Sequence, residues 1–270
     1  MTEKNLALEA LSSKLAKYLP PQVYGSIFAG QREVEIASSR KKLTIFFSDI
    51  VDFTQTTDEL ESEELTSLLN RYLTEMAKIA LEHGATVDKY VGDAILAFFG
   101  DPDTRGVRQD ALACVRMAIA MQRRMTELRA EWLDAGLEKP FRLRIGINTG
   151  FCTVGNFGSE ARMDYTIIGG AVNLTARLQA HTEPGGILLS HETWSHVRDT
   201  IAADEQAPLE LKGFAKPVRC YRVRESGDAA ADSRLIREEK DGLRLQLDLD
   251  RLGPEAAARV LEDVLARLRH

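Results

Sequence analysis

Two aspartates occupy places in the sequence where side chains can converge on a ligand. Asp49 ends the buried strand that LTIFFSDIV predicts, and Asp93 lies at the tip of a hairpin between TVDKYV and AILAFFG. Strand ends and tight turns often carry ligand contacts. Paired carboxylates there suit hard divalent cations, which in turn suit phosphate-bearing substrates. Gly-Asp is also ordinary turn chemistry, so each aspartate taken singly has a purely structural alternative.

A second polar pair lies on a predicted helix. In AVNLTARL, Asn173 and Arg177 are four residues apart, so both side chains project from one helix face. An ordinary helix with a polar stripe would give the same spacing. Two further cations, Arg144 in LRIG and Lys212 in LKGF, each have an ordinary surface interpretation when taken alone.

Hydrophobic periodicity predicts the elements that position these residues. Apolar positions recur every three or four residues from Asp58 to Gly84, and a second long helix is expected over about 107–135. The order is β-α-β-β-α-β, which indicates an α+β, ferredoxin-like sheet with helices on one face. The remaining predicted strands are FRLRIGINTG, MDYTII, ILLS, LELKGF and VRCYRV.

The chain divides into three predicted parts. Residues 1–42 form a helical connector, with short helices expected at 5–19 and in QVYGSIFAG. Residues 43–225 form the main domain. Residues 226–270 contain the linker SGDAAADS and a C-terminal β-α extension, made of LRLQLDL and a helix that Pro254 opens. This extension is too small to fold alone.

Composition narrows the class of protein. The chain has 270 residues, with 35 Lys and Arg against 41 Asp and Glu, so its net charge of −6 argues against a generally basic nucleic-acid surface. No run approaches the roughly 18 uninterrupted apolar residues of a membrane-spanning helix, and MTEKNLALEA lacks a secretory core. The three cysteines are odd in number and form no CxxC pair. We therefore expect a cytoplasmic protein without disulfides.

Several ordered motifs together carry a family resemblance. FFSDIVDFT, DKYVGDAILAFFG, RIGINTG, DYTIIGGAVNLTARL and LKGFAKPV follow one another over residues 46–218. In this order they resemble the catalytic domain of the class III nucleotide cyclases. The resemblance implies that two such domains pair head to tail, with a nucleoside triphosphate at their interface. It also implies that one chain, as a homodimer, carries two complete sites.

The resemblance assigns roles to the acidic residues and to a neighbouring turn. Asp49 and Asp93 match the two metal-binding aspartates, and Ile50 lends a backbone carbonyl. The implied cofactors are two divalent cations, Mg²⁺ or Mn²⁺, which activate the ribose 3′-hydroxyl for attack on the α-phosphorus. Phe53 and Thr54 match a turn whose backbone amides hold terminal phosphate oxygens.

The resemblance also assigns the polar residues of the helix and the two further cations. Asn173 matches the residue that orients the ribose, and Arg177 the one that stabilises charge on the α-phosphate in the transition state. Arg144 and Lys212 match contacts to the phosphates. An upstream sensor or membrane region drives the dimer in many bacterial relatives, so the chain is either a stand-alone enzyme or a piece of a membrane-associated one.

Lys89 and Thr166 match the residues that read the base. Adenine presents an acceptor at N1 and a donor at N6, whereas guanine presents the reverse at N1 and O6. A lysine can only donate, so Lys89 suits adenine, whereas the Thr166 hydroxyl can accept from N6 or donate to O6. The leading interpretation is an adenylate cyclase acting on ATP. The alternatives are a guanylate cyclase, or an idle module that binds nucleotide without turnover.

Overall fold

The computed structural model divides into two compact units. One is formed by residues 1–197 and 205–222, and the other by residues 198–204 and 223–270. The candidate site residues and most of the sheet lie in the first unit. The structure describes residues 12, 14, 16, 20–28, 30, 35–55, 61–159, 161–214, 216–224, 235–240, 243–248 and 254–268.

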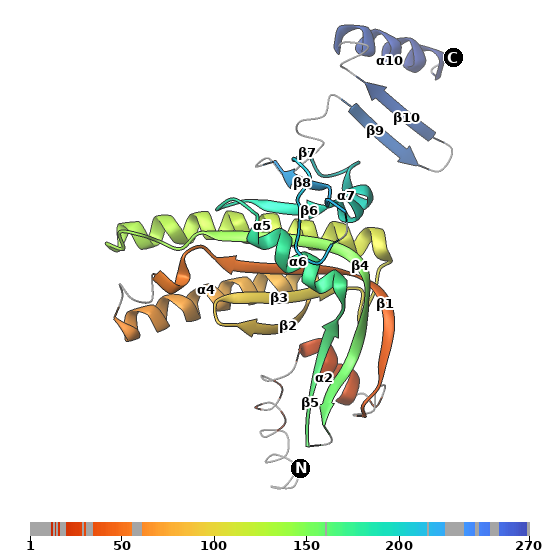
Figure 1. Cartoon of the computed structure of the whole chain (residues 1–270). Helices are drawn as coiled ribbons and strands as arrows, with labels where there is room; N and C mark the ends of the chain where they lie inside the picture. The colour runs from red at the N-terminus through yellow and green to blue at the C-terminus, as the bar shows by residue number, and fades with distance from the viewer. Residues whose placement is uncertain are drawn as a thin grey trace, which may run out of the picture. The chain divides into compact units, whose positions relative to one another are not determined.

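A mixed sheet forms the centre of the first unit (Figure 1). Its strands follow the order β2-β3-β1-β4-β6-β8-β7, and β5 pairs with β4 away from this path. The predicted α+β fold and its β-α-β-β-α-β order are confirmed. The six elements of that order are β1 (Ser38–Ile50), α4 (Ser62–His83), β2 (Thr86–Val91), β3 (Ala94–Phe99), α5 (Val107–Asp134) and β4 (Leu143–Ser159).

Strand β1 lies inside the sheet, between β3 and β4. It pairs antiparallel with β3 on one side and with β4 on the other. The β1–β4 ladder runs from Ser38 opposite Gly155 to Ile50 opposite Leu143, and it places Asp49 directly opposite Arg144. Residues opposite one another in such a ladder have neighbouring side chains. The register therefore brings a predicted metal ligand next to a predicted phosphate contact.

One buried hydrophobic cluster fixes β5 (Arg162–Ile168) and the start of α6 (Gly170–Ala180) against β1. Close packing of such a cluster leaves its backbone little freedom to shift. The backbone positions of Thr166 on β5 and Asn173 on α6 are therefore held in place by this packing. The cluster joins Leu43 and Ile45 of β1, Leu96 and Phe98 of β3, and Tyr165 and Ile167 of β5, with Ala171 and Val172 of α6 packed against it.

Helix α6 lies unusually close to β4. A Cβ atom at Gly146 would lie 2.4 Å from the Gln179 backbone nitrogen and 2.5 Å from the Thr175 carbonyl oxygen, so only glycine fits there. Asn148 adds a hydrogen bond from Nδ2 to the Ala171 carbonyl at 3.0 Å. Because Gly146 and Asn148 are two residues apart on a strand, both point to the face that α6 covers.

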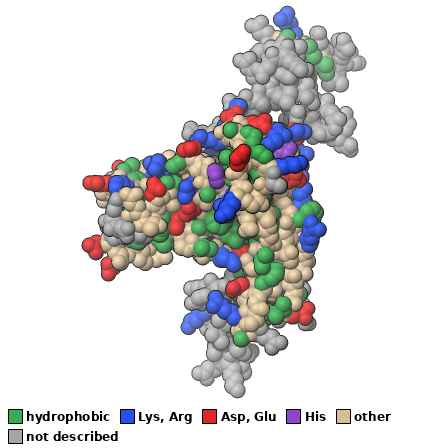
Figure 2. Space-filling view, viewed as in Figure 1, with side chains coloured by type: hydrophobic (Ala, Val, Ile, Leu, Met, Phe, Trp, Pro, Cys, Tyr) green, Lys and Arg blue, Asp and Glu red, His purple; other side chains and the backbone are tan. Residues whose placement is uncertain are grey.

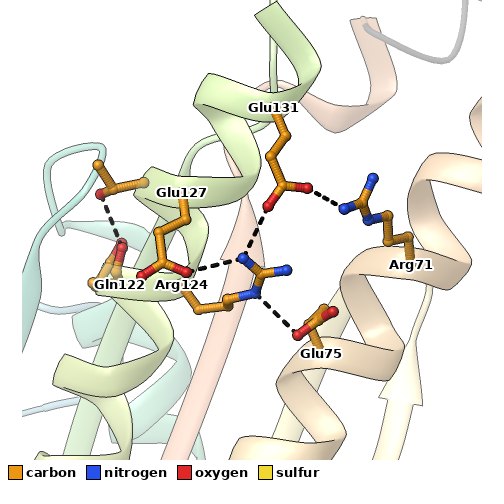
Figure 3. Close-up of polar contacts among 7 residues, drawn as sticks. Arg71, Glu75, Gln122, Arg124, Glu127 and Glu131 are labelled. Atoms are coloured by element: carbon orange, nitrogen blue, oxygen red, sulfur yellow. Dashed lines mark hydrogen bonds and ion pairs between the residues drawn. The ribbon is translucent and has the colours of Figure 1, made fainter. Parts of the chain in front are cut away.

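Helices α4 and α5 are joined by a network of charged side chains (Figure 3). Arg124 Nε donates to Glu75 at 3.0 Å, and its Nη1 donates to Glu127 at 2.9 Å and Glu131 at 3.0 Å. Glu131 also pairs with Arg71. The hydrogen bond from Arg124 is the main cause that lowers the pKa of Glu75 below its usual value.

Replacing Arg124 by methionine is expected to lower the free energy of unfolding by about 1 kcal/mol at pH 7. Because the folded pKa of Glu75 is depressed, its contribution is present above the unfolded pKa and is lost as the pH falls through the folded value. The deficit of Arg124→Met should therefore shrink towards pH 3. Urea unfolding at both pH values measures it, with Arg123→Met, an exposed neighbour, as the control. An equal deficit at both pH values would contradict the assignment.

The segment LELKGF was predicted to be a strand, and this prediction is wrong. Leu209 forms only an isolated bridge with Val218, and the chain then turns at Lys212 and Gly213. Gly213 has φ +94°, which suits glycine and breaks an extended run, and the Phe214 N–H donates to the Leu211 carbonyl at 3.0 Å. The neighbouring elements are β6 (Ile187–Ser190), α7 (His191–Val197), β7 (Ala203–Glu205) and β8 (Cys220–Val223), of which α7 and β7 were not predicted.

The ends of the chain differ in part from the sequence expectation. The short helix expected in QVYGSIFAG is α2 (Pro21–Phe28). The helix expected over 5–19 and the linker over 226–233 fall largely or wholly outside the described residues. The C-terminal extension is a hairpin of β9 (Leu235–Lys240) and β10 (Leu243–Asp248) followed by α10 (Pro254–Leu268), so the predicted β-α unit lacked one strand.

Candidate active site

The two predicted metal-binding aspartates lie together. Asp49 is near the end of β1, and Asp93 lies in the tight turn between β2 and β3. Asp93 accepts a hydrogen bond from the Ile50 backbone N–H at 2.8 Å, which ties the turn to the strand end. Burial, together with the smaller effect of the neighbouring Asp49 carboxyl, raises the pKa of Asp93 to about 7. Two carboxylates from distant segments therefore share one small region.

Two other side chains contact Asp49. Arg144 donates from Nη2 to Asp49 Oδ2 at 2.9 Å, as the β1–β4 register leads one to expect. Gln179, a buried residue of α6, donates from Nε2 to the same oxygen at 3.3 Å. Sequence analysis did not single out Gln179. Its contact depends on the close approach of α6 to β4, which no local sequence pattern encodes.

The donor set fits a hard divalent cation. Asp49 and Asp93 offer carboxylate oxygens, the ligands that Mg²⁺ and Mn²⁺ prefer. Burial is the main cause of the raised pKa of Asp93, and repulsion from Asp49 adds to it; a bound cation would offset that repulsion. Among the described residues no group of three or more His, Cys, Asp or Glu side chains could hold a metal ion. Two carboxylates suit a cation that takes its other ligands from phosphates and water.

A second group of predicted residues lines one hollow of about 620 Å³. Asn173 and Arg177 contribute from α6, and Lys212 contributes from the turn that follows Leu211. Gly213 and Phe214 complete this turn. The hollow thus presents two cations and an amide from segments about forty residues apart in the sequence, an arrangement suited to an anionic ligand.

Lys89 and Thr166 form a third group, because both contact the carboxylate of Asp88. Sequence analysis did not single out Asp88. Asp88 Oδ2 accepts from Thr166 Oγ1 at 2.6 Å and from the Ile167 N–H at 3.2 Å, and its Oδ1 lies 3.3 Å from Lys89 Nζ. Burial raises the pKa of Asp88, while these contacts lower it. The only available sequence signal was the acidic residue directly before Lys89.

The predicted phosphate turn follows directly after β1. Asp52 has φ +55°, and the three residues after it are helical, so an αL residue precedes an αR segment in the manner of an anion nest. Phe53 packs edge-on against Phe141 with ring centroids 5.8 Å apart, and Phe141 packs in the same way on Trp132. The aromatic contacts anchor the turn that carries Thr54.

The predicted site residues therefore fall into separate groups within one chain. The structure brings Asp49 together with Asp93 and Arg144, and it brings Asn173 together with the two cations of the hollow. Lys89 and Thr166 form the third group around Asp88, and Phe53 and Thr54 the fourth. The contact from Gln179 links α6, which carries Asn173 and Arg177, to the acidic pair.

Residues 36–225 match the family described as the Adenylate and Guanylate cyclase catalytic domain. This match covers well over half of the chain, so the chain belongs to the adenylate and guanylate cyclase catalytic domain family. The ordered motifs over residues 46–218 had predicted this membership, and the prediction is confirmed.

Solved structures of both cyclase types resemble the chain. The adenylyl cyclase CyaB from P. aeruginosa is 54% identical, with a TM-score of 0.69 over 70% of this chain and 96% of that one. The guanylyl cyclase Cya2 is 36% identical, with a TM-score of 0.66 over 70% of this chain and 94% of that one. Because adenylyl and guanylyl cyclases share this fold, the fold alone does not distinguish an ATP-specific enzyme from a GTP-specific one.

Longer relatives share the same region. The adenylate cyclase of Anabaena cylindrica is 33% identical over 242 residues, which are 83% of this chain and 47% of that protein. Adenylate cyclase 1 of Rhizobium meliloti is 29% identical over 191 residues, 69% of this chain and 28% of that protein. The chain thus spans less than half the length of these relatives. Within the described residues, no helix combines the length and apolar character needed to cross a membrane.

Proposed function

We propose that this protein is an adenylate cyclase that converts ATP to 3′,5′-cyclic AMP and pyrophosphate. The observation that carries this proposal is the juxtaposition of Lys89 and Thr166 on one buried carboxylate. The lysine supplies a donor for adenine N1, whereas it would face the N1 proton of guanine. The 54% identity to the adenylyl cyclase CyaB supports the same choice of base.

The acidic pair is the proposed metal site, with Asp49 and Asp93 as side-chain ligands and the Ile50 carbonyl as a backbone ligand. Bound there, Mg²⁺ or Mn²⁺ would lower the pKa of the ribose 3′-hydroxyl and offset triphosphate charge. Arg144 contacts Asp49, and it would bind a phosphate beside this pair. The Phe53–Thr54 amides would hold the terminal phosphate oxygens.

The hollow on α6 is the proposed site of phosphoryl transfer chemistry. Asn173 would orient the ribose so that its 3′-oxygen is in line with the α-phosphorus. Arg177 would stabilise the negative charge that accumulates on the α-phosphate as pyrophosphate leaves. Lys212, which lines the same hollow, would hold the triphosphate.

The complete site is proposed to form only in a homodimer. Asp49, Asp93 and Arg144 of one chain would face Asn173 and Arg177, with the base-reading residues, of the other. Figure 2 shows hydrophobic side chains on the surface over the β4 and β5 part of the sheet. Phe151 is 57% exposed and Ile168 is 51% exposed, which suits burial against a second copy. An upstream sensor or membrane region of a longer protein would then act by changing how the two copies meet.

A guanylate cyclase is the second candidate, because Cya2 is 36% identical. Lys89 argues against it, since a lysine offers no acceptor for the guanine N1 proton. An idle nucleotide-binding module is the third. Loss of a metal aspartate or of Arg177 is the expected mark of such a module, and this chain keeps Asp49, Asp93 and Arg177.

Metal dependence tests the proposed chemistry. Purified protein with ATP and Mn²⁺ is expected to release pyrophosphate and cyclic AMP, and excess chelator should stop both. Asp49→Asn keeps the shape but removes a charged ligand, so the rate should fall on the order of 100-fold or more. Asp103→Asn, at an exposed loop position, is the matched control. Product formation that survived both the chelator and Asp49→Asn would refute the metal-site proposal.

A further inference from the structure

Asp88 occupies an irregular position in its strand. In the β2–β3 ladder Val87 pairs with Ala97 and Lys89 pairs with Leu96, so Asp88 has no partner of its own. This extra residue is a β-bulge, a feature that re-aims side chains and is common beside active sites. In a regular strand adjacent side chains point to opposite faces. Here the bulge lets Asp88 contact the side chain of its neighbour Lys89.

The Asp88 carboxylate is buried, and its two oxygens differ: Oδ2 accepts two hydrogen bonds, whereas Oδ1 has the ion pair with Lys89 but no hydrogen bond. Its side chain is only 1% exposed, whereas that of Lys89 is 42% exposed. The three contacts to Thr166, Ile167 and Lys89 offset part of the cost of burying a charge, and burial still raises the pKa of Asp88 above its usual value. Two of them come from β5, which pairs with β4, so the carboxylate joins β5 to β2. Asp88 therefore fixes the positions of both base-reading residues.

The contact with Asp88 also determines which way the Thr166 hydroxyl can bond. An ionised carboxylate only accepts hydrogen bonds, and a threonine hydroxyl has a single proton. At 2.6 Å that proton is committed to Asp88 Oδ2. Towards a ligand, Thr166 Oγ1 then offers only its lone pairs. The sequence alone left open whether this hydroxyl donates or accepts.

We propose that Asp88 is a specificity-determining positioning residue, which makes Thr166 a hydrogen-bond acceptor and holds Lys89 beside it as a donor. The inference rests on the proposed function, because it concerns the base-reading part of that same site. A donor next to an acceptor matches adenine, which accepts at N1 and donates at N6. Guanine has the opposite pattern at N1 and O6, so both contacts fail with it. A site built in this way leaves buried groups unpaired when the wrong base enters.

Equilibrium binding of 3′-deoxy-ATP and 3′-deoxy-GTP tests the inference without turnover, because neither analogue has the attacking hydroxyl. Calorimetry with Mn²⁺ gives the ratio of the two Kd values for each full-length variant. The wild-type protein should prefer the adenine analogue. Asp88→Ala frees the Thr166 proton to donate to guanine O6, so the preference should fall about tenfold. A merely structural loss would weaken both analogues equally and leave the ratio unchanged, which would overturn the inference.

A double-mutant cycle shows whether Asp88 acts through Thr166. Thr166→Val removes the hydroxyl, and the double variant Asp88→Ala/Thr166→Val should lose much less than the sum of the two single losses. If the loss in the double variant equalled the sum of the two single losses, Asp88 would not act through Thr166. Asp88→Asn is the conservative variant: its amide oxygen still accepts from Thr166 and Ile167, so the preference should fall at most about threefold. If Asp88→Ala does not fold, Thr166→Val and Asp88→Asn still test the inference. An unchanged ratio of the two Kd values in Thr166→Val would refute it.

The same experiment separates this inference from the proposed function. Wild-type protein that prefers the adenine analogue but forms no cyclic AMP would remove the enzyme assignment and leave the role of Asp88 standing. If the wild-type protein forms cyclic AMP but Asp88→Ala keeps the same preference for the adenine analogue, the enzyme assignment stands and the role of Asp88 is refuted. Equal affinity of the wild-type protein for both analogues would overturn the inference outright.

Discussion

A mixture of Asp49→Ala and Arg177→Ala chains is expected to form cyclic AMP, although neither variant does so measurably alone. If each site takes its acidic pair from one chain and its arginine from the other, a homodimer of either variant has two damaged sites. A heterodimer has one site with both defects and one with neither. Random pairing makes half of the dimers heterodimers, so an equal mixture should recover about a quarter of the wild-type rate.

The recovered activity is easy to detect, because each variant alone is expected to lose most of its activity. Removing a group that stabilises transition-state charge costs on the order of 100-fold to 1,000-fold in kcat, and losing a metal ligand costs at least as much. The two chains are mixed, unfolded and refolded together, and their dimers are verified by light scattering. A mixture of Asp49→Ala with Asp93→Ala is the matched control, because both residues belong to the same half of the site. A first mixture no more active than this control would contradict the shared site.

Lys89→Glu is expected to reverse the choice of nucleotide. A carboxylate at this position accepts from the guanine N1 proton and faces adenine N1 with no donor. The kcat/KM for ATP should fall on the order of 100-fold, and the ratio of GTP to ATP use should rise by more than that. Lys89→Met, which removes the charge at similar length, should lose ATP use without gaining GTP use. Initial rates with each nucleotide measure both variants.

The reversal is expected to remain incomplete while Asp88 is present. Asp88 still commits the Thr166 proton, so guanine O6 meets an acceptor, and the introduced glutamate lies beside a second carboxylate. Like charges this close are destabilising. Adding Asp88→Ala to Lys89→Glu should therefore raise the kcat/KM for GTP further. A double variant with no better GTP use than Lys89→Glu alone would count against the role given to Asp88.

Hydrophobic periodicity predicted most of the fold because the elements that carry it are long. Helix α4 shows a regular apolar spacing and ends where expected, at Gly84 with φ +83°. The failures occurred where a pattern was short or ambiguous. LELKGF alternates like a strand, yet Gly213 adopts a positive φ and turns the chain. The sequence LIREEK of β9 has no apolar alternation, so its strand depends on pairing with β10 rather than on its own pattern.

The same distinction separates the predicted site residues from the missed ones. Asp49 and Asp93 could be paired in advance because a strand end and a hairpin tip are recognisable in the sequence. Asn173 and Arg177 share a helix face by spacing alone. Asp88 and Gln179 could not be found in this way, because one depends on a β-bulge and the other on the glycine-mediated approach of α6 to β4. Their contacts exist only once the tertiary structure has formed.

The most direct test of the account is to identify the product of the wild-type protein. Purified protein is incubated separately with ATP and with GTP, each with Mg²⁺ and with Mn²⁺, and cyclic AMP and cyclic GMP are quantified by mass spectrometry. We predict cyclic AMP from ATP, with cyclic GMP formed at least about tenfold more slowly from GTP. Cyclic GMP as the main product would contradict the base recognition assigned to Lys89 and Asp88, and protein that formed neither product would contradict the proposed enzyme activity.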